Sequence, residues 1–153
     1  MWPDVEEQVA VEQAQIAQLF EAYQAAISKS SQQEPDFIEL SALATMLHSF
    51  YTGIENIFKR IALEIDGDIP SGYASHSDLL TAMTRSTASR PPVISEELHV
   101  RLSAYLSFRH VFRHAYSFQL EWDKMRDLVL QSPATWQQLQ TELDRFFSRS
   151  NPR

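Results

Sequence analysis

The sequence predicts an all-α protein folded as one domain. Only three of its 153 residues are glycines and 44% are hydrophobic, a composition that favours packed helices over a β-sandwich. Apolar residues also recur at spacings of three and four, which is the period of an amphipathic helix. A chain of this length can bury a conventional hydrophobic core. We therefore expect residues 1–153 to form a single helical domain, with flexible ends at about residues 1–3 and 150–153.

Two long helices are predicted in the first half of the chain. The first covers about residues 4–29, because Pro3 and acidic residues stand at its start. The polar stretch 28–35 predicts a connecting loop. The second helix, over about residues 36–65, would be on the order of 45 Å long and form the spine of a bundle. The regularly spaced apolar residues of this second helix are Leu40, Leu43, Leu47, Phe50, Ile54, Ile57, Ile61 and Ile65.

The middle of the chain predicts a short helix between two loops. Residues 67–76 contain two glycines and a proline and predict the first loop. Ser77 can then cap a short helix over residue 78 to about residue 87, because a serine hydroxyl can accept from free backbone N–H groups. The prolines in residues 90–92 interrupt the chain again.

Two more helices are predicted in the second half. Ser95 is followed by two glutamates, which favour a helix start because they complement the positive end of the helix dipole. Ser132 and Pro133 predict the start of a last helix that ends at about Arg149. A break or kink is expected between residues 116 and 122.

The charge is distributed unevenly along the chain. Residues 1–97 contain 5 basic and 15 acidic residues, whereas residues 98–153 contain 8 and 5, and the whole chain has a net charge of −7. An acidic protein has weak non-specific affinity for nucleic acid. A focused cationic cleft in the second half is nevertheless able to hold RNA.

Several kinds of site are disfavoured by the residues present. The absence of cysteine excludes disulfides, thiolate zinc sites and cysteine nucleophiles. The chain has no H-E-x-x-H, glycine-rich phosphate loop or G-x-S-x-G, and Asp66 and Asp68 lack the spacing of an EF-hand. We expect neither a metal site nor a cofactor. Because no apolar run approaches the roughly 18 residues that span a bilayer, and residues 1–4 lack a basic leader, we expect a soluble cytoplasmic protein with no membrane partner.

The most informative segment is the run from Phe108 to Tyr116, which contains two arginines and two histidines. Histidine titrates near neutral pH, and the guanidinium of arginine binds phosphate with fixed geometry. Such a cluster inside an otherwise apolar run indicates a site that cleaves phosphodiesters. Its candidate residues are Arg109, His110, Arg113, His114 and Tyr116.

A helical wheel of about 100° per residue separates these side chains. The apolar stripe expected to pack into the bundle consists of Ala104, Phe108, Val111, Ala115 and Phe118. Arg109, Arg113 and Tyr116 fall on roughly the opposite side, and His110 and His114 share a flank.

The positions of Arg109 and His114 on the wheel predict a shared site. The two residues are about 140° apart, so one straight helix cannot direct both at the same phosphate. Either the helix bends or a second copy of the chain completes the site. Leu102 and Leu106 continue the arginine side upstream and predict another packed surface there, which favours a two-fold dimer with motif helices near the axis.

These residues carry a resemblance to a known family. Arg109, His114 and Tyr116 match the R-x4-H-x-Y signature of the HEPN superfamily, and the flanking sequence is similar to HepT-like ribonuclease toxins. The similarity covers roughly residues 36–147. The flanking segments that support it are 51–62, 65–67, 70–72, His76 before Leu79-Leu80, and 120–123.

The resemblance implies a homodimeric, antiparallel helical bundle that acts as a metal-independent ribonuclease. Arg109 would hold nonbridging phosphate oxygens, and His114 would move a proton to or from a reacting oxygen. His110 and Arg113 would support them. The substrate would be RNA, either tRNA or mRNA, because the reaction would use the ribose 2′-OH.

The resemblance also implies a partner. HepT-like toxins are paired with minimal nucleotidyltransferase antitoxins in type VII-like toxin–antitoxin modules. Tyr116 corresponds to the tyrosine that such a partner modifies with AMP. A bulky anionic adduct there would crowd the cleft and repel an RNA phosphate.

Two other functions remain open from the sequence. A catalytically silent helical module that docks a nucleotidyltransferase would use the same fold, and a purely structural bundle would depend on neither Arg109 nor His114. The other histidines, His48, His76 and His99, show no ligand spacing, and structural or surface roles are predicted for them.

Overall fold

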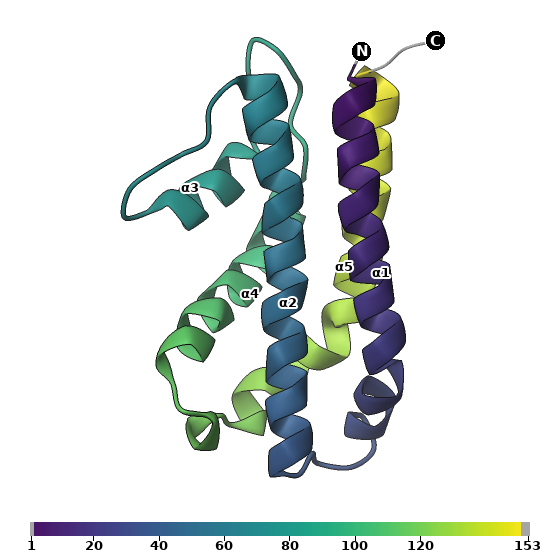
Figure 1. Cartoon of the computed structure of the whole chain (residues 1–153), viewed down its shortest axis with the longest axis vertical. Helices are drawn as coiled ribbons and strands as arrows, with labels where there is room; N and C mark the ends of the chain where they lie inside the picture. The colour runs from purple at the N-terminus through teal and green to yellow at the C-terminus, as the bar shows by residue number, and fades with distance from the viewer. Residues whose placement is uncertain (1, 151–153) are drawn as a thin grey trace.

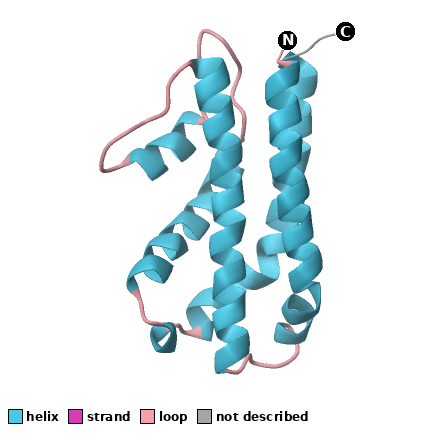
Figure 2. Cartoon of the chain, viewed as in Figure 1, coloured by secondary structure: helices cyan, strands magenta, loops and turns pink. Residues whose placement is uncertain are grey.

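The computed structural model describes residues 2–150 and is all-helical (Figure 1). Five α-helices follow one another along the chain: α1 (Pro3–Ser30), α2 (Phe37–Ile61), α3 (Ser75–Ala82), α4 (Glu96–His114) and α5 (Trp122–Ser150). Figure 2 shows helices joined by loops, and no strand occurs within residues 2–150, which confirms the predicted fold class. None of these helices is long and apolar enough to cross a membrane.

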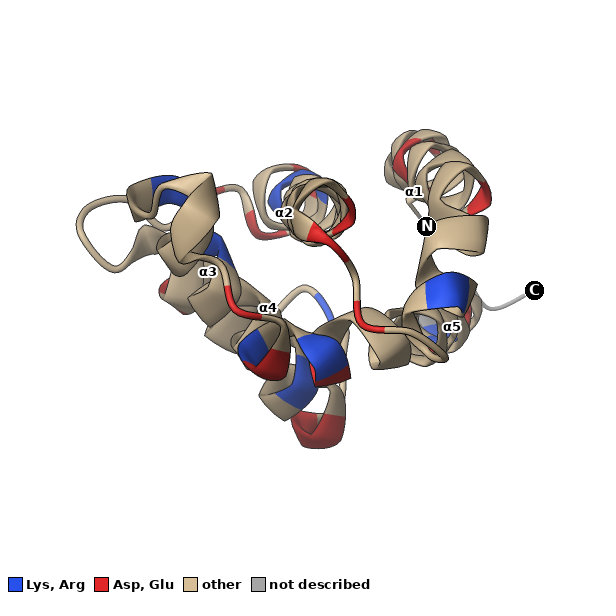
Figure 3. Cartoon of the chain, turned by 90° about the horizontal axis from the view of Figure 1, so that it is seen from below, with Lys and Arg blue, Asp and Glu red and all other residues tan. Residues whose placement is uncertain are grey.

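Four of the helices form the bundle. Viewed from one end, α1 and α2 lie side by side, with α5 and α4 packed beneath them and α3 beside α2 (Figure 3). Along the chain, the four bundle helices α1, α2, α4 and α5 alternate in direction (Figure 1). The arrangement is therefore the predicted antiparallel bundle, with α2 in contact with each of the other four helices.

The α1–α2 hairpin is held by a well-formed cap. The Asp36 carboxylate accepts from the Glu39 backbone N–H, and the Glu39 side chain accepts from the Asp36 N–H, which satisfies free donors at the start of α2. Glu39 also binds Lys29 of α1 at 2.7 Å. The predicted loop at 28–35 is shorter than expected, because α1 continues as a helix to Ser30.

Helix α2 is the predicted spine. It continues past Ile61 into a π-helical turn, Ala62–Asp66, and Gly67 then ends it with a positive φ of 83°. Further along α2, Gly53 permits the close approach of α1, since a Cβ there would lie 2.7 Å from the side chain of Ile16. The helix and its end at Gly67 agree with the sequence prediction.

The predicted bounds of the third helix are wrong at both ends. Helix α3 begins at Ser75, before the expected cap, and the Ser77 hydroxyl donates to the Ala74 carbonyl instead of capping. It ends at Ala82 because the next residue, Met83, uses its carbonyl to accept from the N–H groups of Val93 and Ile94. This long-range pairing turns the chain out of the helix.

A buried ion pair joins the end of α2 to the segment after α3. Arg90, whose side chain is fully buried, donates to both carboxylate oxygens of Asp66 at 2.8 and 2.9 Å. The same guanidinium donates to the carbonyls of Ala82, Arg85 and Pro91. It therefore neutralises Asp66 and satisfies carbonyls that α3 leaves free where it ends.

The predicted start of the last helix is also wrong. Helix α5 begins at Trp122 and contains Pro133, and its ribbon bends along its length (Figure 1). The Ser132 hydroxyl donates to the Val129 carbonyl, which has no proline N–H to bind, and the Tyr105 hydroxyl donates to the Leu128 carbonyl. These two bonds stabilise a proline within the helix. The predicted break between residues 116 and 122 is present, before α5.

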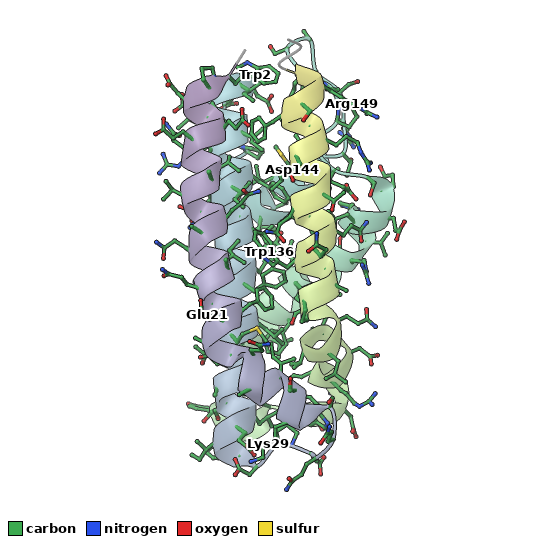
Figure 4. The ribbon with its side chains drawn as sticks, turned by 90° about the vertical axis from the view of Figure 1, so that its right-hand side faces the viewer. Trp2, Glu21, Lys29, Trp136, Asp144 and Arg149 are labelled. Atoms are coloured by element: carbon green, nitrogen blue, oxygen red, sulfur yellow. The ribbon has the colours of Figure 1, made fainter. Side chains whose placement is uncertain are left out.

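The two ends of the described chain lie at the same end of the bundle (Figure 4). Trp2 stacks on Phe146 with a centroid separation of 5.7 Å, and Pro3 already belongs to α1. Of the ends that were predicted to be flexible, Met1 and residues 151–153 lie outside the described residues.

The Arg90–Asp66 pair provides a test of this packing. Arg90→Ala removes a buried guanidinium and leaves the partly buried Asp66 carboxylate and three carbonyls without their donor, so we expect the free energy of unfolding to fall by about 3 kcal/mol. Urea denaturation measures the change. The matched control is Arg126→Ala, because Arg126 is exposed and lies 3.9 Å from Asp127; its expected loss is below about 1 kcal/mol. Equal losses in the two variants would contradict the role of the buried pair.

Candidate functional site

The face of α4 that packs into the bundle differs from the prediction. The buried residues of this helix are Leu98, Leu102, Tyr105 and Phe108. Of the apolar stripe expected to be buried, only Phe108 is; Ala104, Val111 and Phe118 are exposed. The aromatic contact of Tyr105 with α2 decides the orientation, because it rotates the other side of the helix inward.

This rotation of α4 explains why Leu102 and Leu106 are apolar. Leu102 is fully buried and Leu106 packs partly against the core of the same chain. They were predicted to indicate a second packed surface, and that interpretation is wrong, because the core itself covers them.

Arg109 lies on the side of α4 that faces α2. It continues the stripe of Leu102 and Tyr105 at helical spacing and is half-buried. Its positive charge is close enough to influence the pKa values of His48 and Tyr51, both on α2. Within residues 2–150, neither Arg109 nor Arg113 forms an ion pair. Two guanidiniums therefore lie along the boundary between α2 and α4, which we call the α2–α4 seam, without a carboxylate partner.

The two motif histidines lie elsewhere on α4. His110 and His114 are exposed, and their rings approach each other with centroids 4.6 Å apart. The helix is unbroken to His114, so it does not bend between Arg109 and His114. The two side chains leave a straight helix about 140° apart. A single chain thus places the arginine towards α2 and the histidine towards solvent.

Tyr116 follows directly after the helix. Its side chain is 71% exposed and stacks on Phe118 with an interplanar angle of 7°. Its backbone N–H donates to the Gln119 side-chain oxygen, which holds the extended turn after α4. The ring of Tyr116 is therefore presented to solvent next to the motif.

His48 is the residue of this region that sequence analysis missed. Its imidazole stacks on Phe112 with centroids 4.9 Å apart, and its Nδ1 is buried without a hydrogen-bond partner among residues 2–150. Burial, and then the charges of Arg109 and Arg113, lower the pKa of His48. No sequence spacing connects His48 to the motif, because the two lie on different helices that only the tertiary fold brings together.

Tyr51 also borders Arg109 in the α2–α4 seam. Its side chain is almost fully buried, and burial together with the charge of Glu55 raises the pKa of the hydroxyl well above its usual range, despite the opposing effect of Arg109. Tyr51 is therefore neutral at physiological pH.

The other polar clusters connect elements of the fold. The buried Glu55 carboxylate binds His76 of α3 at 2.8 Å and Lys59 at 3.4 Å, and Asp66 is bound by Arg90. Across residues 2–150 no group of three or more carboxylate or imidazole side chains is placed to bind a metal ion.

An apolar groove lies on the outward side of α4, between that helix and the start of α5. Its volume is about 580 Å³ and its apolar lining includes Ala104, Val111, Leu120 and Leu128. Val111 is 52% exposed there. Apart from Phe108, the stripe that was predicted to be buried therefore lies at the surface of the chain.

Comparison with known families identifies the chain. A model of the HepT-like protein family matches residues 42–150, which include α3, α4, α5 and nearly all of α2. The chain belongs to the HepT-like family. This places it in the HEPN superfamily, whose members are generally ribonucleases. No curated protein and no solved structure gives a significant match to the chain. The matched range contains the motif and His48 of this HepT-like protein.

The lowered pKa of His48 predicts a pH dependence of stability. Histidine in the unfolded chain takes up a proton near pH 6.5, whereas folded His48 resists protonation. The unfolded state therefore binds more protons as the pH falls. The stability that neutral His48 contributes is fully present above about pH 6.5 and is lost as the pH falls through the folded-state pKa.

The measurement is urea denaturation between pH 5 and pH 8. We expect His48→Phe, which keeps a ring on Phe112, to lose less stability than wild type on acidification. His99→Phe is the control, because His99 lies near the other end of α4, and it should retain the wild-type dependence. Parallel curves for wild type and His48→Phe would contradict the prediction.

Proposed function

We propose that this HepT-like protein is a metal-independent endoribonuclease toxin of a type VII-like toxin–antitoxin module. Arg109 and His114 are its catalytic pair, with His110 and Arg113 in support. The observation that carries the proposal is Arg109 itself: a half-buried guanidinium without an ion pair in residues 2–150, on the same unbroken helix as an exposed histidine. The HepT-like family match supports this assignment.

The chemistry follows from the two side-chain types. The Arg109 guanidinium donates to nonbridging oxygens and stabilises the negative charge that develops at phosphorus. The His114 imidazole takes a proton from the attacking oxygen or gives one to the leaving oxygen of the ribonucleotide linkage. His114 is exposed and therefore accessible to an RNA strand, and its ring lies against that of His110. The RNA is a tRNA or an mRNA.

A homodimer completes the site. One straight helix directs Arg109 and His114 about 140° apart, so a common phosphate needs an arginine from one protomer and a histidine from the other. The groove on the outward side of α4 supplies exposed apolar surface that a second copy can cover.

A subunit-mixing experiment tests catalysis and sharing together. Wild type, Arg109→Ala and His114→Ala are incubated with RNA in EDTA, and we expect cleavage by wild type and loss of cleavage in both variants. Unfolding and refolding the two variants together produces mixed dimers, each with one intact shared site. With random pairing about half of the dimers are mixed, and one of the two sites in each mixed dimer is intact. The mixture therefore recovers about one quarter of the wild-type rate.

Two outcomes would contradict parts of the proposal. Wild type that binds but does not cleave RNA would favour the catalytically silent module that docks a nucleotidyltransferase. Cleavage by wild type with no recovery in the mixture would place both residues of each site in one protomer. His99→Ala, which changes a histidine outside the motif, controls for effects of the procedure.

Silencing of the toxin acts through Tyr116. A partner nucleotidyltransferase transfers AMP to its hydroxyl: the tyrosyl oxygen bonds to the α-phosphorus of ATP and pyrophosphate leaves. The ring is 71% exposed, so a partner enzyme can reach it. The adduct adds a negative charge and bulk two residues after His114, where it repels an RNA phosphate.

Tyr116→Phe separates silencing from catalysis. We expect this variant to cleave RNA at the wild-type rate but to remain active after incubation with ATP and the partner nucleotidyltransferase. Mass spectrometry should find the AMP adduct on wild type alone. Tyr73→Phe is the matched control, because Tyr73 is also exposed and lies outside the motif. Modification of Tyr116→Phe at the wild-type rate would remove the assignment.

A further inference from the structure

His48 joins the arginines of the motif in the α2–α4 seam. Its ring stacks on Phe112, the residue that precedes Arg113, and lies in the electrostatic range of Arg109 and Arg113. On its other side His48 borders a groove of about 360 Å³ between α1 and α2. Three nitrogen-bearing side chains, from two helices, therefore gather at one place next to open solvent.

The charge of this cluster is not balanced by the protein. Arg113 is exposed, whereas the other arginines that are withdrawn from solvent as Arg109 is have partners: Arg90 binds Asp66, and Arg101 donates to Gln138. Arg109 and Arg113 have no ion pair within residues 2–150. Two neighbouring guanidiniums without a counter-ion favour an anion between or beside them, and a phosphate matches their geometry.

The buried Nδ1 of His48 is an unsatisfied polar atom next to these arginines. Buried polar atoms in native proteins are nearly always hydrogen-bonded, so an unpartnered nitrogen needs an explanation. Packing against Phe112 does not explain a histidine at position 48, since a phenylalanine at that position would stack equally well without the cost of a desolvated nitrogen. A ligand whose binding rearranges the seam can give this nitrogen a partner.

We propose that His48, Arg109 and Arg113 form one phosphate subsite across the α2–α4 seam, in which the imidazole is neutral in the free protein and takes up a proton when a phosphodiester binds. The inference deepens the proposed ribonuclease function and rests on it for the identity of the ligand as RNA. It makes His48 a third phosphate-binding group, contributed by a helix outside the motif.

The charges around His48 explain both protonation states. On α4 it faces Arg109 and Arg113, on α2 it is followed by the neutral Tyr51, and across the groove on α1 stands Glu12. In the free protein, burial and then the charges of the two guanidiniums disfavour an imidazolium. A bound phosphate offsets both guanidiniums and accepts from the ring, so the protonated form becomes favourable.

The first test reads the ring directly. Histidine ring NMR signals of wild type are titrated with and without a short 2′-O-methyl RNA oligonucleotide, which lacks the free 2′-OH and stays intact. We expect the His48 pKa to lie below that of a free histidine in the absence of RNA and to rise when RNA binds. An unchanged His48 pKa at saturating RNA would overturn the proposal.

The second test measures affinity for the same oligonucleotide. If binding is coupled to proton uptake by His48, the RNA affinity of wild type must increase as the pH falls. The increase is at most tenfold per pH unit and occurs between the pKa values of bound and free His48. His48→Phe keeps the stack on Phe112, and it should bind about tenfold more weakly at pH 6 and show a flatter pH dependence. His99→Phe, with its histidine outside the seam, should follow wild type. A pH dependence of His48→Phe identical to wild type would overturn the proposal, and its thermal unfolding confirms that the variant is folded.

The results separate this inference from the ribonuclease proposal. If the His48 pKa rises on RNA binding but EDTA-treated wild type cleaves no RNA, the phosphate subsite stands and the catalytic proposal fails. If Arg109-dependent cleavage occurs while His48 does not respond to RNA, the ribonuclease stands and the subsite is limited to α4.

Discussion

The contact of Phe50 with three other aromatic rings orients the bundle around α2. This fully buried side chain meets Phe20 of α1, Tyr105 of α4 and Trp136 of α5 edge to face, with centroids 5.1, 5.4 and 6.4 Å apart. Edge-to-face contacts are directional, so each one fixes the rotation of its helix as well as its distance. Figure 4 shows Trp136 between α1 and α5. For α4, this contact sets the direction of Arg109, which follows Tyr105 by one turn and therefore faces α2.

The rotation of α4 gives its two sides different tasks. The side towards α2 carries Arg109 near His48, and the partial burial of Arg109 favours electrostatic interaction with the phosphate that we propose binds there. The outward side carries the exposed histidine pair and, further round, the apolar groove. The angle of about 140° between Arg109 and His114 on one straight helix is the physical reason for proposing that two copies build each site.

The bend of α5 connects the bundle to this outward side. Tyr105 contributes twice, because its ring contacts Phe50 and its hydroxyl bonds the Leu128 carbonyl before Pro133. The first turns of α5 then lie beside the last turns of α4 and form the second wall of the apolar groove. A proline that would disrupt an isolated helix is stable here because Ser132 and Tyr105 bind the carbonyls around the bend.

The sequence by itself determined the helical class, the long α2, the Ser95 cap and the motif, since helical periodicity, capping and the family resemblance are local properties of residue order. Tertiary structure alone decided the bounds of α3, which depend on Arg90 and the pairing of Met83, and the inward face of α4. A helical wheel gives relative angles but no absolute rotation, because that depends on partners elsewhere in the chain. For the same reason His48 had no signal in the sequence: its neighbours Arg109 and Phe112 are close only after α2 and α4 pack together.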